Sequence, residues 1–179
     1  MDEPELTPAE RAWVASRLRQ LRERDSWLMG TYAEHVVADA LVGAQPSASS
    51  FAAWDLDWND ISIEVKCSTE RQTGVTEADK PSPAKWTVPP HYAWNHEAGD
   101  WHPGEKTRWA KVYVLARHEG FDHLSGWTFF VVPCWWLDAR TSVSVTGASL
   151  RSAGWGPHDR AGLPEAVRAA AASSPPDEH

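Results

Sequence analysis

Residues 54–68 read WDLDWNDISIEVKCS, two alternating segments on either side of the pair Asn59-Asp60. Asparagine and aspartate tolerate the left-handed backbone that a two-residue hairpin turn requires. The spacing therefore predicts a β-hairpin in which Trp58 lies opposite Ile61. Directly opposed side chains share one face of a sheet, and the faces alternate along each strand. This register consequently assigns every side chain of the hairpin to one of two faces.

The predicted hairpin has one apolar face and one charged face. The apolar face carries Trp54, Leu56, Trp58, Ile61, Ile63 and Val65. The charged face carries Asp55, Asp57, Ser62, Glu64 and Lys66. Like charges directly across a sheet destabilise it, so the pair Asp55 and Glu64 needs a compensating cation. Either Lys66 or a divalent metal such as Mg²⁺, which prefers oxygen ligands, would supply one.

A third acid comes from the segment before the hairpin. The sequence predicts a helix from Ser26 to Leu41, with Gly43 as its C-terminal stop. Glu34 falls at helical spacing from four apolar or small residues, namely Trp27, Gly30, Ala38 and Leu41. A carboxylate within an apolar stripe needs a partner, which is either a metal or an arginine.

The remaining segments predict an α/β or α+β domain built around one mixed sheet. Residues 7–24 begin with a capping box, Thr7 and Glu10, and form an amphipathic helix. Residues 85–90 are predicted to be a strand and 91–98 a short helical turn. Apolar strands follow at 109–116 and 126–133, then a helical turn at 134–139, a strand or loop at 142–150 and a helix at 163–172. We expect residues 1–25 to pack as an extra N-terminal helix on a domain spanning 26–172, followed by a disordered tail over 173–179.

Length and composition restrict the protein class. A chain of 179 residues, 42% hydrophobic and 23% charged, is typical of one globular domain. It contains no apolar run near the roughly 20 residues of a membrane span, and its first residues are acidic, which predicts a cytoplasmic protein without a membrane partner. Two cysteines, Cys67 and Cys134, fit neither a disulfide framework nor a zinc ribbon and are predicted to be small buried residues.

Charge and tryptophan content favour different partners. A net charge of -8 argues against non-specific coating of nucleic acid, which usually requires a basic excess. The twelve tryptophans follow no fixed period. They are interpreted as large core residues, with sugar-stacking platforms as the alternative.

Glu34 on a helix, then Asp55, then Glu64-Val65-Lys66, resembles the PD-(D/E)xK nuclease superfamily, whose core is a helix, three strands, a helix and a strand. More locally, the segments GTYAE, WDL, IEVKCS, VYV and WTFFVVP are similar to a bacterial branch of that superfamily. The resemblance covers most of the chain after residue 25. Trp54 stands where the family motif has a proline.

The resemblance implies a restriction endonuclease-like core and a Mg²⁺ site in which Mn²⁺ can substitute. Asp55, Glu64, Glu34 and the backbone carbonyl of Val65 would hold the metal, and Lys66 would position or activate the attacking water. Gln72, Ser68 and Lys85 are expected substrate contacts.

The resulting hypothesis is a Mg²⁺-dependent endonuclease that hydrolyses DNA in phage defence or DNA processing, as a homodimer if both strands are cut. No separate target-reading domain is evident, so a partner protein would supply specificity. An inactive nuclease-like subunit that binds DNA or other proteins is the main alternative, and a tryptophan-rich carbohydrate-binding module is the remote one.

Other polar residues offer weaker signals. His91, His96 and His102 fit no familiar zinc spacing and are interpreted as loop residues or substrate contacts. Six basic residues lie in or beside the loops after the hairpin and are either solvated or phosphate contacts: Arg71, Lys80, Lys85, Lys106, Arg108 and Lys111.

Overall fold

A six-stranded sheet in the order β1-β2-β3-β7-β8-β10 forms the centre of the protein. The computed structural model describes residues 26–47, 53–69, 83–95, 99–101, 104–119 and 126–176. The strands are β1 (Gln45–Pro46), β2 (Leu56–Trp58), β3 (Ile61–Thr69), β7 (Val112–His118), β8 (Trp127–Pro133) and β10 (Pro157–His158). β3 and β7 are parallel, whereas the other neighbouring strands are antiparallel. The predicted mixed sheet is therefore confirmed.

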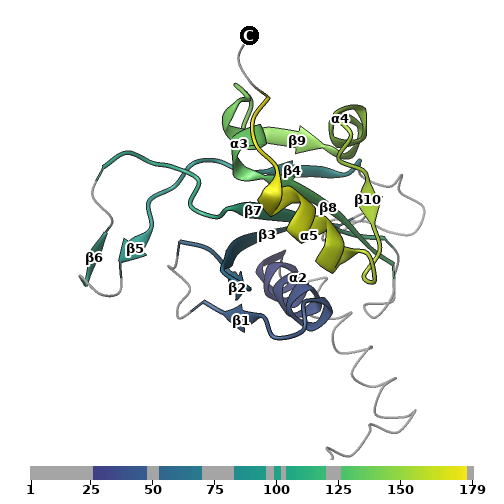
Figure 1. Ribbon diagram of the computed structural model, residues 1–179, viewed down its shortest axis with the longest axis horizontal. Coiled ribbons are helices and arrows are strands. Elements are labelled where there is room, and N and C mark those ends of the chain that lie inside the picture. Colours follow the sequence, from purple (N-terminus) through teal and green to yellow (C-terminus); the bar gives the residue numbers. More distant parts are fainter. Residues whose placement is uncertain are drawn as a thin grey trace, which may run out of the picture.

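Both faces of the sheet are covered (Figure 1). Helices α2 (Ser26–Ala40) and α5 (Leu163–Ala172) lie against one face. Their apolar side chains form one core cluster with Ile63, Val65 and Val114. The other face is covered by β4 (Lys85–Thr87) paired with β9 (Ser144–Thr146), and by α3 (Cys134–Asp138) and α4 (Gly147–Ser152). The sheet is thus the middle layer of the fold.

The hairpin β2–β3 has the predicted turn. Asn59 and Asp60 adopt positive φ angles of 49° and 62°, and Trp58, Asp57 and Leu56 pair with Ile61, Ser62 and Ile63. The pairing ends there, so the predicted pairs of Asp55 with Glu64 and of Trp54 with Val65 are wrong. The Asp55 amide instead donates to the Ile63 carbonyl, at 3.0 Å. This displacement turns Trp54 to the opposite side, where it packs against the second core cluster and not on the predicted apolar face.

Helix α2 ends at Ala40, and Gly43 follows with a φ of 88°, as the sequence predicts. The buried stripe of α2 consists of Ala33, Val37 and Leu41, whose side chains join the first core cluster. The predicted stripe through Gly30, Glu34 and Ala38 is therefore displaced. Glu34 is half-buried at the flank of the stripe, on a helix that packs against β3.

Strands β7 and β8 confirm the two predicted apolar strands. Every residue of β7 is buried, as expected for a strand between two others. The predicted helical turn at 134–139 and the helix at 163–172 correspond to α3 and α5. The 142–150 segment was predicted to be strand or loop, and it contains β9 followed by the short helix α4.

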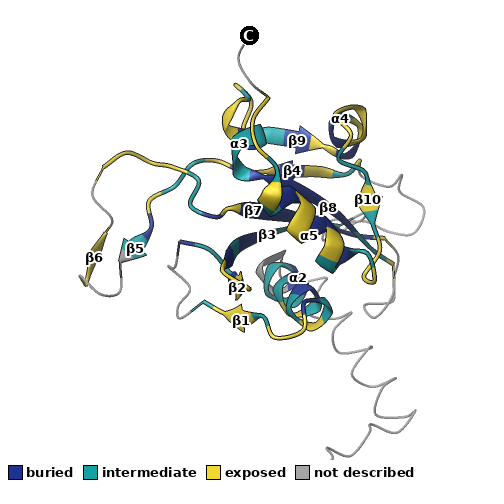
Figure 2. Ribbon diagram, in the orientation of Figure 1, coloured by how far each residue is buried: buried dark blue, intermediate teal, exposed yellow. Residues whose placement is uncertain are grey.

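The predicted helical turn at 91–98 is wrong over its described part, 91–95. Trp94 and Asn95 form β5, which pairs with β6 (Asp100–Trp101), while His91 forms a bridge with Thr107. The family core that the sequence resembles has a helix between its third and fourth strands. The described part of the crossover from β3 to β7 contains no such helix and carries β4, β5 and β6 instead. We name residues 91–95, 99–101 and 104–108 the arm. It projects from the body and is largely exposed at β6 (Figures 1 and 2).

Several predictions fall at the edge of the described ranges or beyond them. The N-terminal helix at 7–24 and Gln72 lie outside the described residues. At the start of the predicted disordered tail, the Ser173 hydroxyl accepts from the Trp135 indole and donates to the Ala170 carbonyl. Among the helices described, none has the length and apolar character needed to cross a membrane.

The tryptophans are distributed between core and surface. Trp58 and Trp86 are buried, whereas Trp101 is 48% exposed and most other described tryptophans are half-buried. Paired tryptophan rings meet at 88° (Trp94 and Trp101), 65° (Trp135 and Trp155) and 71° (Trp136 and Trp155). These steep angles are unlike the coplanar rings of a sugar-stacking platform.

Candidate active site

Asp55 lies where β2 separates from β3. The Val65 amide donates to Asp55 Oδ2 at 2.7 Å, so the carboxylate takes the position that a paired strand would otherwise occupy. Among the described residues, no strand pairs with this edge of β3 beyond Ile63. In a strand the N–H and C=O of one residue point to the same side. The Val65 carbonyl therefore points to the same open edge as Asp55.

Glu64 and Lys66 lie on the adjacent face of β3. Glu64 is only 5% exposed, and the Lys66 ammonium forms an ion pair with Glu64 Oε1. Two residues apart on one strand, these side chains share a face, as the sequence predicts. An aspartate, a glutamate and a lysine are thus brought together at one edge of the sheet.

Burial makes the acids of this site difficult to ionise together. The pKa of Asp55 is raised to about 6, mainly by burial and then by the charge of Glu64, while the Val65 hydrogen bond and Lys66 oppose the shift. Burial likewise raises the pKa of Glu64, although Lys66 counteracts it. Burial alone would lower the pKa of Lys66, but the charges of Glu64, Asp55 and Glu34 outweigh it and raise the pKa. Lys66 is therefore protonated at neutral pH.

Helix α2 brings Glu34 to the same group. Burial and the nearby charge of Asp55 raise the pKa of Glu34, whereas His35 and Lys66 lower it. Glu34 also contributes to the raised pKa of Glu64. The two partners predicted for Glu34 are a metal and an arginine. Among the described residues, the charges that act on Glu34 are those of Asp55, His35 and Lys66, so Glu34 lies near the acidic site.

His91 is a neighbour of the site whose position sequence reasoning left open. Its pKa is lowered by burial first and by the charge of Lys66, while a hydrogen bond to Pro89 and the charge of Asp55 oppose the shift. Conversely, His91 lowers the pKa of Asp55. No sequence spacing indicates this proximity, because His91 reaches the site through the crossover between β3 and β7. His96 and His102 lie outside the described residues.

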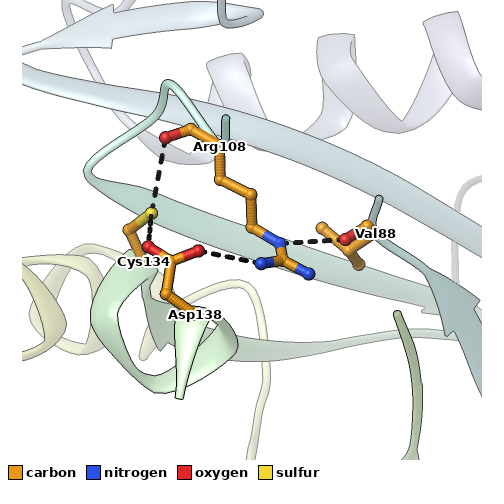
Figure 3. Close-up of polar contacts among 4 residues, drawn as sticks. All are labelled: Val88, Arg108, Cys134 and Asp138. Carbon is orange, nitrogen blue, oxygen red and sulfur yellow. Dashed lines mark hydrogen bonds and ion pairs between the residues drawn. The ribbon is translucent and has the colours of Figure 1, made fainter. Parts of the chain in front are cut away.

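The segment before His91 is held by Arg108 (Figure 3). Arg108 Nε donates to the Val88 carbonyl at 2.9 Å, and Nη1 donates to Asp138 Oδ1 at 2.8 Å. The Cys134 thiol donates to the Arg108 carbonyl, at 3.6 Å, and to Asp138 Oδ2, at 3.3 Å. With its side chain only 6% exposed, Arg108 is a structural clamp and fits neither predicted alternative, a solvated charge or a phosphate contact.

Cys134 belongs to this clamp and is not a nucleophile. Burial, followed by its hydrogen bond to Asp138 and that carboxylate's charge, raises its pKa to about 12, which keeps it a thiol at neutral pH. Both Cys67 and Cys134 are half-buried, so the prediction that they are small buried residues is corrected to partial burial. Their partial burial reflects their places at the last residues of β3 and the first turn of α3.

Two of the three predicted substrate contacts lie together beside Lys66. Ser68 follows Lys66 on the same face of β3, and its hydroxyl accepts from the Lys85 amide at 3.5 Å and from Arg117 Nη1 at 3.3 Å. Lys85 is exposed. Gln72, the third, is outside the described residues. Lys106 lies 5.4 Å from the centre of the Tyr92 ring, and Lys111 is exposed at the start of β7.

The family resemblance implies a Mg²⁺ ion, which the oxygen ligands at this edge of β3 would have to bind. Within the described ranges, no group of three or more His, Cys, Asp and Glu side chains is arranged to hold a metal ion. Asp55 and Glu64 nonetheless supply the one or two carboxylates that Mg²⁺ usually takes, its other ligands being waters. The charge of Glu64 also raises the pKa of Asp55, and the charge of Glu34 raises the pKa of Glu64, so a cation beside these carboxylates would favour their ionisation. The donor chemistry therefore fits Mg²⁺ through two carboxylates.

Several solved structures are similar to this chain. A bacterial homing endonuclease, I-Ssp6803I, is similar with a TM-score of 0.41 and 15% sequence identity, over 68% of this chain and 77% of that one. No protein-family model and no curated protein sequence shows a significant match to the chain.

Proposed function

We propose that this protein is a Mg²⁺-dependent endonuclease that hydrolyses phosphodiester bonds in DNA, with a site of the PD-(D/E)xK type. The observation that carries the proposal is the arrangement at the open edge of β3. There Asp55 is fixed by the Val65 amide, Glu64 is paired with Lys66, and Glu34 approaches from α2. Among the described residues no strand pairs with this edge. Asp55 satisfies the Val65 amide there, but the buried Glu64 and its lysine partner serve no need of the sheet itself.

The proposed roles follow from the chemistry of the groups. Asp55, Glu64 and the Val65 carbonyl would hold Mg²⁺, and Glu34, whose charge acts on the same group from α2, would support the site. A bound Mg²⁺ would polarise the phosphoryl oxygens and lower the pKa of the attacking water. Hydrolysis adds the water oxygen to phosphorus and releases the leaving oxygen, which takes up a proton.

Lys66 acts in this proposal as a cation. Because the acids around it raise its pKa, it carries a proton at neutral pH and is unsuited to accept one from water. Its ammonium would instead donate a hydrogen bond to a phosphoryl oxygen, where negative charge develops. Binding of a metal to Glu64 would release Lys66 from its present ion pair for that contact.

A second candidate function is an inactive nuclease-like subunit that binds DNA or assembles with a partner. It is favoured by one observation, the Lys66–Glu64 ion pair, which occupies a carboxylate that a metal would need. A homodimer or a partner protein that supplies target specificity is compatible with either candidate. The processes proposed are phage defence or DNA processing.

Cleavage of plasmid and single-stranded DNA with Mg²⁺ or Mn²⁺ tests the proposal. Asp55→Asn, Glu64→Gln and Lys66→Met should each lower the cleavage rate by about a hundredfold or more, the usual effect of removing one charge-stabilising group. The matched control is Asp57→Asn, because Asp57 is an exposed acid of the same hairpin whose side chain, among the described residues, accepts a hydrogen bond from the Trp54 indole. Cleavage that survives the first three changes would refute the site. Complete inactivity of the wild type with either metal would favour the second candidate.

A further inference from the structure

The arm carries a pair of exposed aromatic side chains. Four large apolar residues are exposed among those described: Val42, Tyr92, Trp101 and Val143. The two aromatic ones, Tyr92 at 49% and Trp101 at 48% exposure, are both in the arm. Single exposed apolar residues are ordinary, whereas exposed apolar residues gathered in one place mark interaction sites, and these two aromatic residues both lie in the short arm.

Neighbouring side chains hold both rings in place. Trp101 meets Trp94 edge to face at 5.5 Å across the β5–β6 pair, and Lys106 lies over the Tyr92 ring at 5.4 Å. An edge-to-face contact holds the Trp101 ring while about half of its residue surface stays exposed. Lys106 adds a positive charge beside the Tyr92 ring. This combination of aromatic faces and a cation is the one used to bind unpaired nucleic acid.

The base of the arm is continuous with the candidate active site. His91 immediately precedes Tyr92 and interacts electrostatically with Asp55 and Lys66. Its backbone exchanges two hydrogen bonds with Thr107, at 2.9 and 3.2 Å, and its carbonyl accepts from the Trp109 indole at 2.9 Å. The arm is therefore anchored at His91, next to the candidate site, and its aromatic residues extend outward from that point (Figure 1).

We propose that the arm binds an unpaired strand of the DNA substrate, whose bases stack on Tyr92 and Trp101 while its backbone passes His91 toward Lys66. The proposal rests on the proposed function for the identity of the substrate. Bases in a duplex hide their faces in the helical stack, so aromatic rings of this kind select bases that are unpaired. Stacking also needs few phosphate contacts, which suits a chain with a net charge of -8.

Fluorescence anisotropy with labelled oligothymidylate of about 20 nucleotides and a duplex of equal length, in EDTA to prevent hydrolysis, tests the arm. Trp101→Ala and Tyr92→Ala should each weaken binding of the oligothymidylate roughly tenfold and leave duplex binding within about twofold. Trp101→Phe, which keeps an aromatic face, should restore most of the affinity. Val42→Ala is the matched control, because it truncates an exposed apolar side chain outside the arm.

Equal affinity of the wild type and the alanine variants for oligothymidylate would overturn the proposal. So would a loss of affinity for the duplex as large as the loss for oligothymidylate. Tighter binding of oligouridylate through the same residues would overturn the assignment to DNA. If Trp101→Ala lowers the thermal stability, Tyr92→Leu provides the second test, because the contacts described for Tyr92 involve only Lys106.

Cleavage measured in parallel separates the two proposals. Arm variants that cleave single-stranded DNA like the wild type would refute the arm and leave the proposed function intact. Arm-dependent binding of single strands without cleavage by any metal would refute the proposed function and leave the arm.

Discussion

Asp55 shows how a single residue can alter both the sheet and the chemistry. A regular hairpin would have placed it directly opposite Glu64 and exposed two like charges to each other. In the structure, its side chain accepts a hydrogen bond from the Val65 amide, as the backbone carbonyl of a paired strand would. The sequence predicts the grouping of Asp55, Glu64 and Lys66. The sequence could not reveal that β2 separates from β3 before Asp55, because the alternation of apolar and polar residues continues as far as Trp54 and suggests that the strand does too.

Asp55 should make the metal-free protein sensitive to pH. Its pKa is raised from 3.8 to about 6 in the folded state, so the protonated form is favoured by folding. The stability that this shift contributes is complete below about pH 4 and is lost as the pH rises through about 6. Asp55→Asn, which stays neutral, should therefore raise the free energy of unfolding near pH 8 by on the order of 2 kcal/mol, and much less near pH 4.

Urea unfolding in EDTA at the two pH values measures this effect. Adding Mg²⁺ near pH 8 should stabilise the wild type more than Asp55→Asn, since binding to the folded state adds stability. If Asp55→Asn had a lower free energy of unfolding than the wild type near pH 8 in EDTA, the charged Asp55 carboxylate would not destabilise the folded protein.

At the scale of elements, the prediction of structure succeeded where local rules and packing agree. The turn at Asn59-Asp60, the stop at Gly43 and the helix α5 all follow from residues that directly favour them. Helix α4 was missed although Thr146 and Ser149 form a capping box, because the pattern there carries serine in place of the usual Glu or Gln. The β5–β6 pair could not be predicted, since two-residue strands depend on their partner.

The turn between β2 and β3 makes a prediction about Asp60. A non-glycine residue in the left-handed region costs about 1–2 kcal/mol, and aspartate reduces that cost by local hydrogen bonding. Asp60→Ala should therefore lower the free energy of unfolding by about 1 kcal/mol. Asp60→Gly should leave it unchanged or raise it, because Asn-Gly is a favoured pair for such turns. Equal destabilisation by both substitutions in urea unfolding would contradict the turn geometry.

The Arg108 clamp predicts a larger effect than a surface ion pair. Arg108→Ala removes hydrogen bonds to Val88 and Asp138 from a buried guanidinium, and should cost about 2 kcal/mol of unfolding free energy. The matched control is Arg160→Ala, because Arg160 and Asp39 form an ion pair in which both side chains are well exposed. That variant should lose less than about 1 kcal/mol.

Amide hydrogen exchange locates the effect of the clamp. If Arg108 fixes the segment that leads to His91, exchange should accelerate at the Val88 and His91 amides, which donate to the carbonyls of Val143 and Thr107, in Arg108→Ala and stay unchanged in Arg160→Ala. If Arg108→Ala and Arg160→Ala lowered the free energy of unfolding equally, the buried contacts of Arg108 would contribute no more stability than an exposed ion pair.

At the scale of the whole molecule, the crossover from β3 to β7 connects the fold with the proposed function. Parallel neighbouring strands require a long connection, and here its described part carries β4, the clamp at Val88, His91 and the arm. The sequence predicts the two apolar strands that this crossover joins, because their runs are long and buried. It gives no sign of His91 at the site, since that contact depends on tertiary placement alone.

The net charge of -8 predicts weak salt dependence of DNA binding. Proteins with 6–10 phosphate contacts lose about 10³–10⁵-fold in affinity between 50 and 200 mM salt. With stacking and a few cations such as Lys66, Lys85 and Lys106, we expect a loss below about a hundredfold. Anisotropy titrations at several salt concentrations measure the slope. A steep slope would indicate an extended basic surface, which the acidic composition does not favour.

The most direct test of the account is the location of a metal ion in crystals soaked with Mn²⁺, read from its anomalous scattering. We expect one peak within coordination distance of both Asp55 and Glu64, with the Lys66 ammonium displaced from Glu64. The peak should be absent in Asp55→Asn crystals. Saturating Mn²⁺ that leaves no peak between these carboxylates, with the Lys66–Glu64 ion pair intact, would contradict it.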